Sequence, residues 1–266
     1  MANSPRISVV CPTFNSAAFL AATLEAVIGQ TLAPVELIVV DDGSSDDTVQ
    51  VVETIFLRAR KNFDCKLLKN GHCGPGGARN AGIQVAGGDW IAFLDSDDLW
   101  LPDKLKVMVE ALGLHDDKNF FCHNELRLRL NGEESLLNYA ERYRPGYSLF
   151  VQLYHSNMFS TSAVICEKKL LLERGGFDET LSSAQDYELW LRLSPHIRPF
   201  FVEQVLGRYV ERRGNITSGR LYTRMMNEIR IACRHAGGVS IWSGVRRMGR
   251  ICLSYGWQFS QRMIQR

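Results

Sequence analysis

Residues 36–45, ELIVVDDGSS, decide the fold, because a strand-forming run changes abruptly into acidic and small polar residues within this one stretch. Apolar, β-branched residues dominate its first half, which is typical of a parallel strand buried on both faces of a sheet. Residues 6–13 (RISVVCPT) and residues 90–97 (WIAFLDSD) repeat the same change. We therefore expect three buried strands that end in loops rich in turn-forming and acidic residues.

Segments with helical spacing of apolar residues separate these strands. They follow the first two strands at residues 19–28 and 48–55, and Gly74-Pro75-Gly76-Gly77 leads into a third helix from about Ala78. Strands that alternate with helices form a parallel sheet covered on both faces. We predict an α/β fold with a mostly parallel, mixed sheet and helices on both faces. Ligands of such sheets bind beyond the carboxyl ends of the strands, so the three loops should form one site.

The rest of the chain has a mixed pattern. A weaker strand is expected at residues 65–68, further strands at residues 120–125 and 162–166, and helices at residues 168–174, 185–193 and 221–235.

The bulk composition is that of a globular protein. The chain has 266 residues, of which 45% are hydrophobic and 23% charged. No basic and apolar leader precedes the first strand, and no apolar run is long enough to span a bilayer. Seven cysteines without a C-x-x-C pair indicate reduced thiols. We expect a cytoplasmic protein.

The net charge of +2 combines two oppositely charged parts. Residues 208–266 contain 12 arginines and two glutamates, a net charge of +10, whereas the first 207 residues hold 19 basic and 27 acidic residues. In this basic segment the arginines alternate with Trp242, Trp257 and aliphatic residues, which fits peripheral contact with the anionic inner face of the cell membrane. A soluble helical cap and an oligomer contact are the alternatives. No nucleic-acid module is recognised, so we expect no nucleic acid partner.

Asp95-Ser96-Asp97 is the first candidate for chemistry. Two carboxylates at one turn can reach a single hard cation, and Mg²⁺ or Mn²⁺ there would hold a diphosphate. Asp42 could accept a hydrogen bond from a base or a ribose. A solvated turn with capping aspartates is the simpler reading of both clusters.

Two further segments are compatible with nucleotide binding. Residues 74–80 place Arg79 near a helix start, where backbone N–H groups and the guanidinium favour an anion. Phe14 could stack on a base. A plain turn and a core aromatic are the alternatives.

Asp186 is the most informative single residue. In a helix over residues 185–193 it shares a face with Leu189 and Trp190, where loss of hydration raises a carboxyl pKa and suits a general base. Helix capping is the alternative role. Glu188 can pair with Arg192 four residues on, and we expect this pair on the surface.

Taken in order, these segments resemble the inverting family-2 glycosyltransferases with a GT-A fold. The similarity is carried by residues 9–31 (VVCPTFNSAAFLAATLEAVIGQT), 36–48 (ELIVVDDGSSDDT) and 74–105 (GPGGARNAGIQVAGGDWIAFLDSDDLWLPDKL), and then by residues 175–179 (GGFDE) and 185–190 (QDYELW). It is dense over residues 6–105 and intermittent beyond them.

The resemblance implies a role for each matching residue. Asp97 would bind the metal directly, Asp95 would lie near ribose and metal, and Asp186 would deprotonate the acceptor hydroxyl. The nucleotide would be bound by Pro12, Thr13, Phe14, Asp42, Arg79, Asp95 and Ser96.

The resemblance also implies a reaction and a domain plan. A sugar would pass from a nucleotide-diphosphate donor, most often a UDP-sugar, to a hydroxyl acceptor such as a lipid-linked glycan in surface polysaccharide synthesis. Residues 1–207 would form the catalytic domain, with a nucleotide-sugar half over about 1–105 and an acceptor half over about 106–207. Residues 208–266 would form a mainly helical extension.

Two positions depart from the family pattern. Gln185 stands where relatives often carry Glu before the base, and Arg212 or Arg213 stands where they often carry His, so an arginine of this loop could contact the diphosphate. Two other functions remain open on the residues alone. One is a nucleotidyltransferase, and the other is a catalytically silent nucleotide-sugar-binding or scaffold protein.

Overall fold

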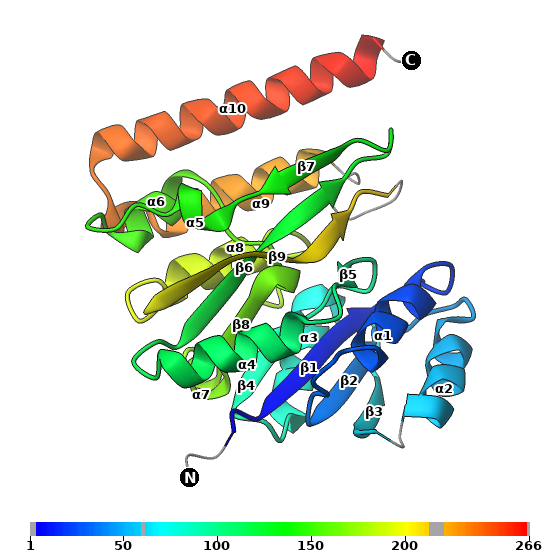
Figure 1. Cartoon of the computed structure of the whole chain (residues 1–266). Helices are drawn as coiled ribbons and strands as arrows, with labels where there is room; N and C mark the ends of the chain where they lie inside the picture. Colours follow the sequence, from blue (N-terminus) through cyan, green and yellow to red (C-terminus); the bar gives the residue numbers. More distant parts are fainter. Residues whose placement is uncertain (1–3, 60–61, 213–220, 265–266) are drawn as a thin grey trace.

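A computed structural model describes residues 4–59, 62–212 and 221–264. Within these residues nine strands form one sheet in the order β3-β2-β1-β4-β8-β6-β9-β5, and β7 pairs with β6 (Figure 1). The pairs among β1, β2, β3 and β4 are parallel, whereas β8 is antiparallel to both of its neighbours. The predicted mixed α/β sheet with helices on both faces is confirmed.

The N-terminal half alternates strands and helices as expected. Its elements are β1 (Ile7–Thr13), α1 (Leu20–Ile28), β2 (Glu36–Asp41), α2 (Thr48–Ala59), β3 (Asp64–Lys69), α3 (Gly74–Val85), β4 (Trp90–Phe93), β5 (Leu99–Trp100) and α4 (Lys104–Leu114). Helix α3 begins at Gly74 and not near Ala78, so that expectation was four residues late. Pro75 lies in its first turn, where a missing N–H costs no helical hydrogen bond.

The second half contains the remaining strands of the sheet. Its elements are β6 (Phe120–Leu128), β7 (Glu134–Leu137), α5 (Tyr139–Arg142), α6 (Leu149–His155), η1 (Thr161–Ala163), β8 (Val164–Glu167), α7 (Lys168–Glu173), α8 (Gln185–Leu193) and β9 (Pro199–Val210). Strand β9 pairs with β6 in parallel and with β5 through Gly207 and Arg208. The sheet therefore extends past residue 207, to Val210.

Helices α9 (Leu221–Arg234) and α10 (Ile241–Ile264), joined through η3 (Ala236–Gly238), form the end of the described chain. Figure 1 shows α10 along the outside of the molecule, with α9 and α6 between it and the sheet. None of the described helices is long and apolar enough to cross a bilayer.

The two faces of the sheet carry separate hydrophobic cores. Val10 and Ile38 belong to the core under α3 and α6 to α10, while their neighbours Val9 and Leu37 belong to the core under α1, α2 and α4. Successive strand residues point to opposite faces of the sheet and so enter the two cores in turn. Together the two cores therefore require apolar residues at successive positions of each buried strand. The unbroken apolar runs read from the sequence follow from this packing.

Candidate active site

The loops after β1 and β2 meet at the carboxyl edge of the sheet. Asp42 donates its backbone N–H to the carbonyl of Thr13, which joins the two loops. The Phe14 side chain is 45% exposed, and its ring centroid lies 4.6 Å from that of His72. Pro12 and Thr13 are buried within β1, beside Val40 and Asp41 of β2. An exposed aromatic pair thus stands over a buried strand end.

The Asp42 carboxylate lies against the N-terminus of α3. It accepts hydrogen bonds from the backbone N–H of Cys73 at 2.7 Å and of Gly74 at 2.9 Å, and His72 Nδ1 lies 3.2 Å away. Such an anchor offsets the positive end of the helix and holds this loop in place. His72 was not identified as a site residue from the sequence. Its position after β3, at the same sheet edge, was the available signal.

Arg79 connects α3 to the acidic loop. This buried guanidinium donates to Asp95 Oδ1 and lies 5.3 Å from the Phe177 ring centroid. Its Nε is buried and has no partner among the described residues. One N–H of this guanidinium therefore has no acceptor among the described residues.

The acidic loop after β4 points its carboxylates in different directions. Asp95 and Asp97 are partly exposed, whereas Asp98 is buried and accepts hydrogen bonds from Ser162 Oγ at 2.6 Å and from the Val210 N–H at 3.1 Å. Burial, and then the neighbouring Asp95, raise the pKa of Asp97 to about 6. Ser96 Oγ lies 3.1 Å from Ser16 Oγ, which ties this loop to the start of α1.

A buried polar layer lies beneath this loop. The fully buried Lys104 donates to the Ser162 carbonyl at 2.6 Å, and Trp100 Nε1 donates to the same oxygen at 3.2 Å. Burial lowers the pKa of Lys104 and raises that of Asp98, so it favours the neutral form of each. The role of Asp98 as an internal anchor was missed, because the sequence does not distinguish it from its exposed neighbours.

Asp186 occupies the second position of α8 and faces the same region. It is half-buried, and its Oδ2 accepts a hydrogen bond from Asn157 Nδ2 at 2.8 Å. Burial raises the pKa of Asp186 despite the lowering contributions of the Tyr187 N–H and Asn157. Arg79 and Asp95 are close enough to act on this pKa electrostatically. Asp186 therefore lies within electrostatic range of Asp95 in the acidic loop.

The residue before α8 has an unusual backbone. Ala184 adopts φ 58° and ψ 22°, the left-handed conformation that residues with a Cβ rarely take. Asn227 of α9 donates from Nδ2 to the carbonyl and hydroxyl oxygens of Ser183 next to it. Residues beyond the sheet thus hold the start of the helix that carries Asp186.

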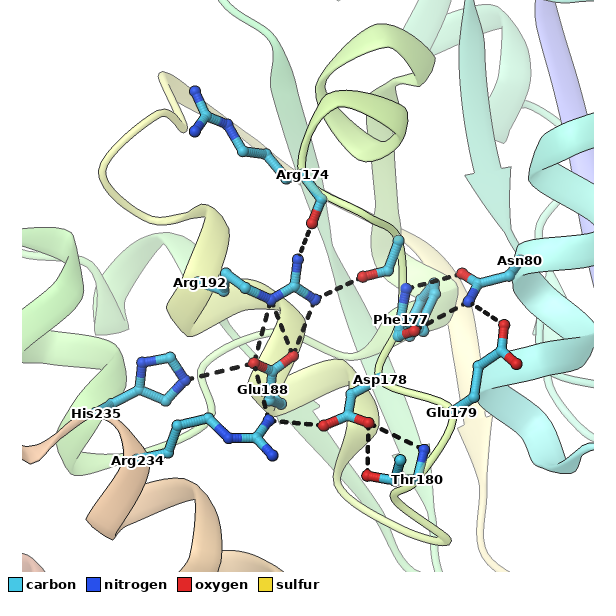
Figure 2. Close-up of polar contacts among 11 residues, drawn as sticks. Asn80, Arg174, Phe177, Asp178, Glu179, Thr180, Glu188, Arg192, Arg234 and His235 are labelled. Atoms are coloured by element: carbon cyan, nitrogen blue, oxygen red, sulfur yellow. Dashed lines mark hydrogen bonds and ion pairs between the residues drawn. The ribbon is translucent and has the colours of Figure 1, made fainter.

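Glu188, two residues further along α8, is only 1% exposed. The predicted surface location is wrong, although the predicted pair with Arg192 is present at 3.0 Å. Arg234 and His235 each place a nitrogen 3.5 Å from its Oε1 (Figure 2). Burial alone would raise the pKa of Glu188, but interactions with His235 and Arg192 outweigh it and lower the pKa. Glu188 is buried because the end of α9 packs beside it, and the spacing of residues within α8 alone could not show this contact.

Figure 2 shows how this cluster extends toward α3. Arg234 also pairs with Asp178 at 2.6 Å, and Asn80 of α3 accepts from the Phe177 N–H at 2.8 Å. The helices α3, α8 and α9 are therefore joined through the loop that precedes α8.

Arg212 stands at the end of β9, beside the acidic loop. Its Nη2 lies 3.4 Å from the Asp97 carbonyl oxygen, and the guanidinium lies 4.7 Å from the Phe19 ring centroid. The Nε is buried without a partner among the described residues. Arg213 lies outside the described residues.

Comparison with known proteins identifies the family. The model of "Glycosyl transferase family 2" matches residues 8–166. The chain belongs to glycosyl transferase family 2. The matched segment includes the acidic loop and the residues at the ends of β1 and β2, while α8 and its Asp186 lie beyond it.

Relatives of this family-2 glycosyltransferase agree with the assignment. An uncharacterised glycosyltransferase of Rickettsia typhi is 31% identical over 208 residues, which cover 76% of this chain but only 63% of that protein. The UDP-Glc:alpha-D-GlcNAc-diphosphoundecaprenol beta-1,3-glucosyltransferase WfaP of Escherichia coli is 24% identical over 259 residues, covering 94% of this chain and 96% of that protein. The chain thus spans less than two thirds of one relative and nearly all of the other.

Solved structures confirm the fold of this family-2 enzyme. S. aureus TarS 1-349 in complex with UDP-GlcNAc matches 96% of this chain and 73% of its own with a TM-score of 0.66 and 21% identity. The mannosyltransferase PcManGT of Pyrobaculum calidifontis, in complex with GDP-Man and Mn²⁺, matches 96% of this chain and 72% of its own with a TM-score of 0.69 and 17% identity. The predicted GT-A architecture is confirmed.

Proposed function

We propose that this glycosyltransferase transfers a sugar from a UDP-sugar to a hydroxyl of a lipid-linked glycan, with inversion at the anomeric carbon. The relative that matches nearly the full chain is named for a glucosyl transfer from UDP-Glc to a diphosphoundecaprenol-linked sugar. A neighbour with the same fold binds UDP-GlcNAc. Both support the donor class, and the first also supports a lipid-linked acceptor.

One observation carries the proposal. Arg79 and Arg212 flank the acidic pair Asp95 and Asp97, each with a buried Nε that has no partner among the described residues. A buried donor without an acceptor costs free energy, and an anion bound there removes that cost. Asp186 lies within electrostatic range of this group. Sugar transfer requires a site that binds the leaving diphosphate and a general base beside it. Two arginines and a nearby carboxylate with a raised pKa fit these two requirements.

The base of the donor would lie over the ends of β1 and β2. Phe14 offers an exposed ring for stacking, and His72 stands beside it. Pro12 and Thr13 would form the floor of the base site. Asp42 would fix the loop that carries His72, and Asp42 would also meet the edge of the base. Ser96 would approach the ribose. Arg213 would join Arg212 at the diphosphate.

Asp186 would act as the general base. An acceptor hydroxyl within hydrogen-bond reach gives its proton to the carboxylate while its oxygen forms the bond to the anomeric carbon. The bond from that carbon to the diphosphate oxygen breaks in the same step, with its electron pair leaving on the diphosphate. Attack from the side opposite the leaving group inverts the configuration. Asn157 would orient the carboxylate for this transfer.

The two partly exposed carboxylates of the acidic loop fit one divalent cation. Among the described residues no group of three His, Cys, Asp or Glu side chains could hold a metal alone, so an all-protein cage is not expected. Asp95 and Asp97 repel each other, and the cost of their half-buried charges falls when a cation joins them. Two carboxylates plus donor phosphates are the usual ligands of Mg²⁺ or Mn²⁺, which would neutralise the charge of the leaving diphosphate. A neighbour with this fold holds Mn²⁺.

The proposal is tested by release of the nucleoside diphosphate from a panel of nucleotide sugars with Mn²⁺ or Mg²⁺. We expect release from one donor with a lipid-linked acceptor, lost in Asp186→Asn with donor binding retained, and lost in Asp97→Ala with weaker donor binding. Asp116→Asn, an exposed carboxylate on the loop after α4, is the matched control and should leave release unchanged. Donor binding without turnover would favour a catalytically silent binding protein. Absence of binding to every donor would refute the proposal.

A further inference from the structure

One side of α10 exposes large apolar side chains. Trp242 is 80% exposed, Leu253 76% and Trp257 65%, and Val245 is 59% exposed on the same side. Their positions in the sequence place them on one stripe of the helix. Two exposed tryptophans on a single helix are unusual for a surface in contact with water alone.

The opposite side of α10 already has its partners. Ile251 and Tyr255 are buried, and Tyr255 donates its hydroxyl proton to Glu228 of α9 at 2.7 Å. Arg247 is buried as well, pairing with Glu228 at 2.8 Å and donating to the His155 carbonyl of α6 at 3.0 Å. The exposed stripe is therefore distinct from the side of α10 that packs against the rest of the chain.

All charged side chains of α10 are positive. Residues 241–264 contain no aspartate and no glutamate. Arg246 and Arg250 are both exposed; around the helix Arg246 lies between Leu253 and Trp257, inside the apolar stripe, and Arg250 lies at its edge beside Trp257, so both guanidinium groups can extend past the tryptophans. We call Trp242, Val245, Arg246, Arg250, Leu253 and Trp257 the outer face of α10.

We propose that the outer face of α10 binds the surface of an anionic membrane, with the helix lying parallel to the bilayer. Tryptophan favours the headgroup region, where its ring is buried and its N–H remains hydrated. The two arginines extend their guanidinium groups to the lipid phosphates, and no carboxylate of the helix opposes that attraction. The helix is not apolar enough to span the bilayer, so it lies on the surface.

A second copy of the chain is a poorer partner for the same face. Two outer faces in contact would bring the exposed arginines of both copies together, and neither helix carries an acidic residue to pair with them. Like charges at an interface oppose association, whereas a lipid surface of opposite charge favours it. The charge pattern therefore selects anionic lipid.

The location of α10 connects its contact with the membrane to the catalytic site, an inference that rests on the proposed function. Arg247 lies with its guanidinium 5.3 Å from the ring centroid of Tyr187, the residue after Asp186. The helix α6, whose last carbonyl accepts from Arg247, leads directly to Asn157, the partner of Asp186. A membrane-bound α10 would thus keep the catalytic base at a fixed place relative to the bilayer that holds a lipid-linked acceptor.

Vesicle sedimentation of the full chain without donor tests the proposal. We expect binding to phosphatidylcholine vesicles that contain phosphatidylglycerol, weaker binding at high salt, and little binding to phosphatidylcholine alone. Arg246→Gln/Arg250→Gln should bind about twenty-fivefold more weakly, about fivefold for each arginine. Trp242→Gln/Trp257→Gln should lose more than about tenfold, because both rings leave the headgroup region.

Leu57→Gln/Leu114→Gln is the matched control, since these side chains of α2 and α4 are 73% and 79% exposed away from α10. It should bind as the wild type does. Equal binding of all variants, or no binding of the wild type, overturns the proposal. A dimer in light scattering that is lost in the tryptophan variant, without vesicle binding, would assign the face to a second copy instead. Transfer to a water-soluble acceptor is measured alongside, so that failure of the proposed function is seen separately.

Discussion

Asn157→Ala should shift the acid limb of the pH profile of kcat/KM upward by about one pH unit. Asn157 donates to the Asp186 carboxylate at 2.8 Å, and this hydrogen bond stabilises the charged form. The general base must be ionised to accept a proton, so activity falls as the pH falls through its pKa. Because burial already raises that pKa, the wild-type limb lies above the ordinary range of an aspartate.

The size of the shift follows from the contact. A hydrogen bond to a charged group contributes about 1.5–3 kcal/mol, and about 1.4 kcal/mol corresponds to one pKa unit. Asn157 is half-buried, so water can replace part of the lost donor and the lower end of the range applies. The plateau at high pH should fall only modestly, since every carboxylate is ionised there.

The assay is kcat/KM for nucleoside diphosphate release across the pH range, with Asn62→Ala as the control. Asn62 is an exposed amide between α2 and β3, and its loss should leave the limb in place. A limb that stays fixed or moves to lower pH in Asn157→Ala would refute the reasoning. It would mean either that Asp186 is not the titrating base or that Asn157 does not favour its ionised form.

Four other substitutions test the packing of the fold and the charges around the site. Gly82→Ala should destabilise the fold by about 1–3 kcal/mol in urea unfolding, because the new Cβ would lie 2.5 Å from Val10 Cγ1. A Cβ at Gly113 would meet no atom within 4 Å, so Gly113→Ala should stabilise the fold by about 0.5–1 kcal/mol. Equal effects at the two glycines would contradict this account. Glu188→Gln should lower the free energy of unfolding by about 2 kcal/mol. The loss is smaller than for a fully buried ion pair because the arginine partners of Glu188 are partly exposed. An unchanged midpoint of urea unfolding would show that the cluster adds no stability. Arg79→Gln should weaken UDP binding in calorimetry about tenfold or more, and undiminished affinity would remove this residue from the diphosphate site.

Much of the donor half could be predicted from the sequence. Strands such as β2 are buried on both faces, so their apolar runs are unbroken and easy to recognise. Parallel strands bring their carboxyl ends to one edge, and this rule alone predicts that Asp42 and Asp95 lie at the same edge of the sheet. Asp186 was recognised because an acidic residue begins an otherwise apolar helix face.

The features that were missed depend on distant parts of the chain. Glu188 is buried by α9, which comes more than thirty positions later in the sequence, so spacing within α8 suggested a surface pair. Asp98 is an internal anchor only because Ser162 and Val210 donate to it from far along the chain. Local patterns report local geometry, and these burials are produced by tertiary contacts.

The pairing of β5 with β9 has a consequence for the biosynthesis of the enzyme. Leu99 and Trp100 find their strand partners only at Arg208 and Gly207, and the carboxylate of Asp98 accepts from the N–H of Val210. During translation, a nascent chain of two hundred residues would carry most of the proposed donor-binding residues and still lack the strand that closes the acidic loop. Contacts so distant in sequence form slowly, and the exposed sheet edge invites wrong partners in the meantime. The acidic loop is therefore completed late, after most of the chain has left the ribosome.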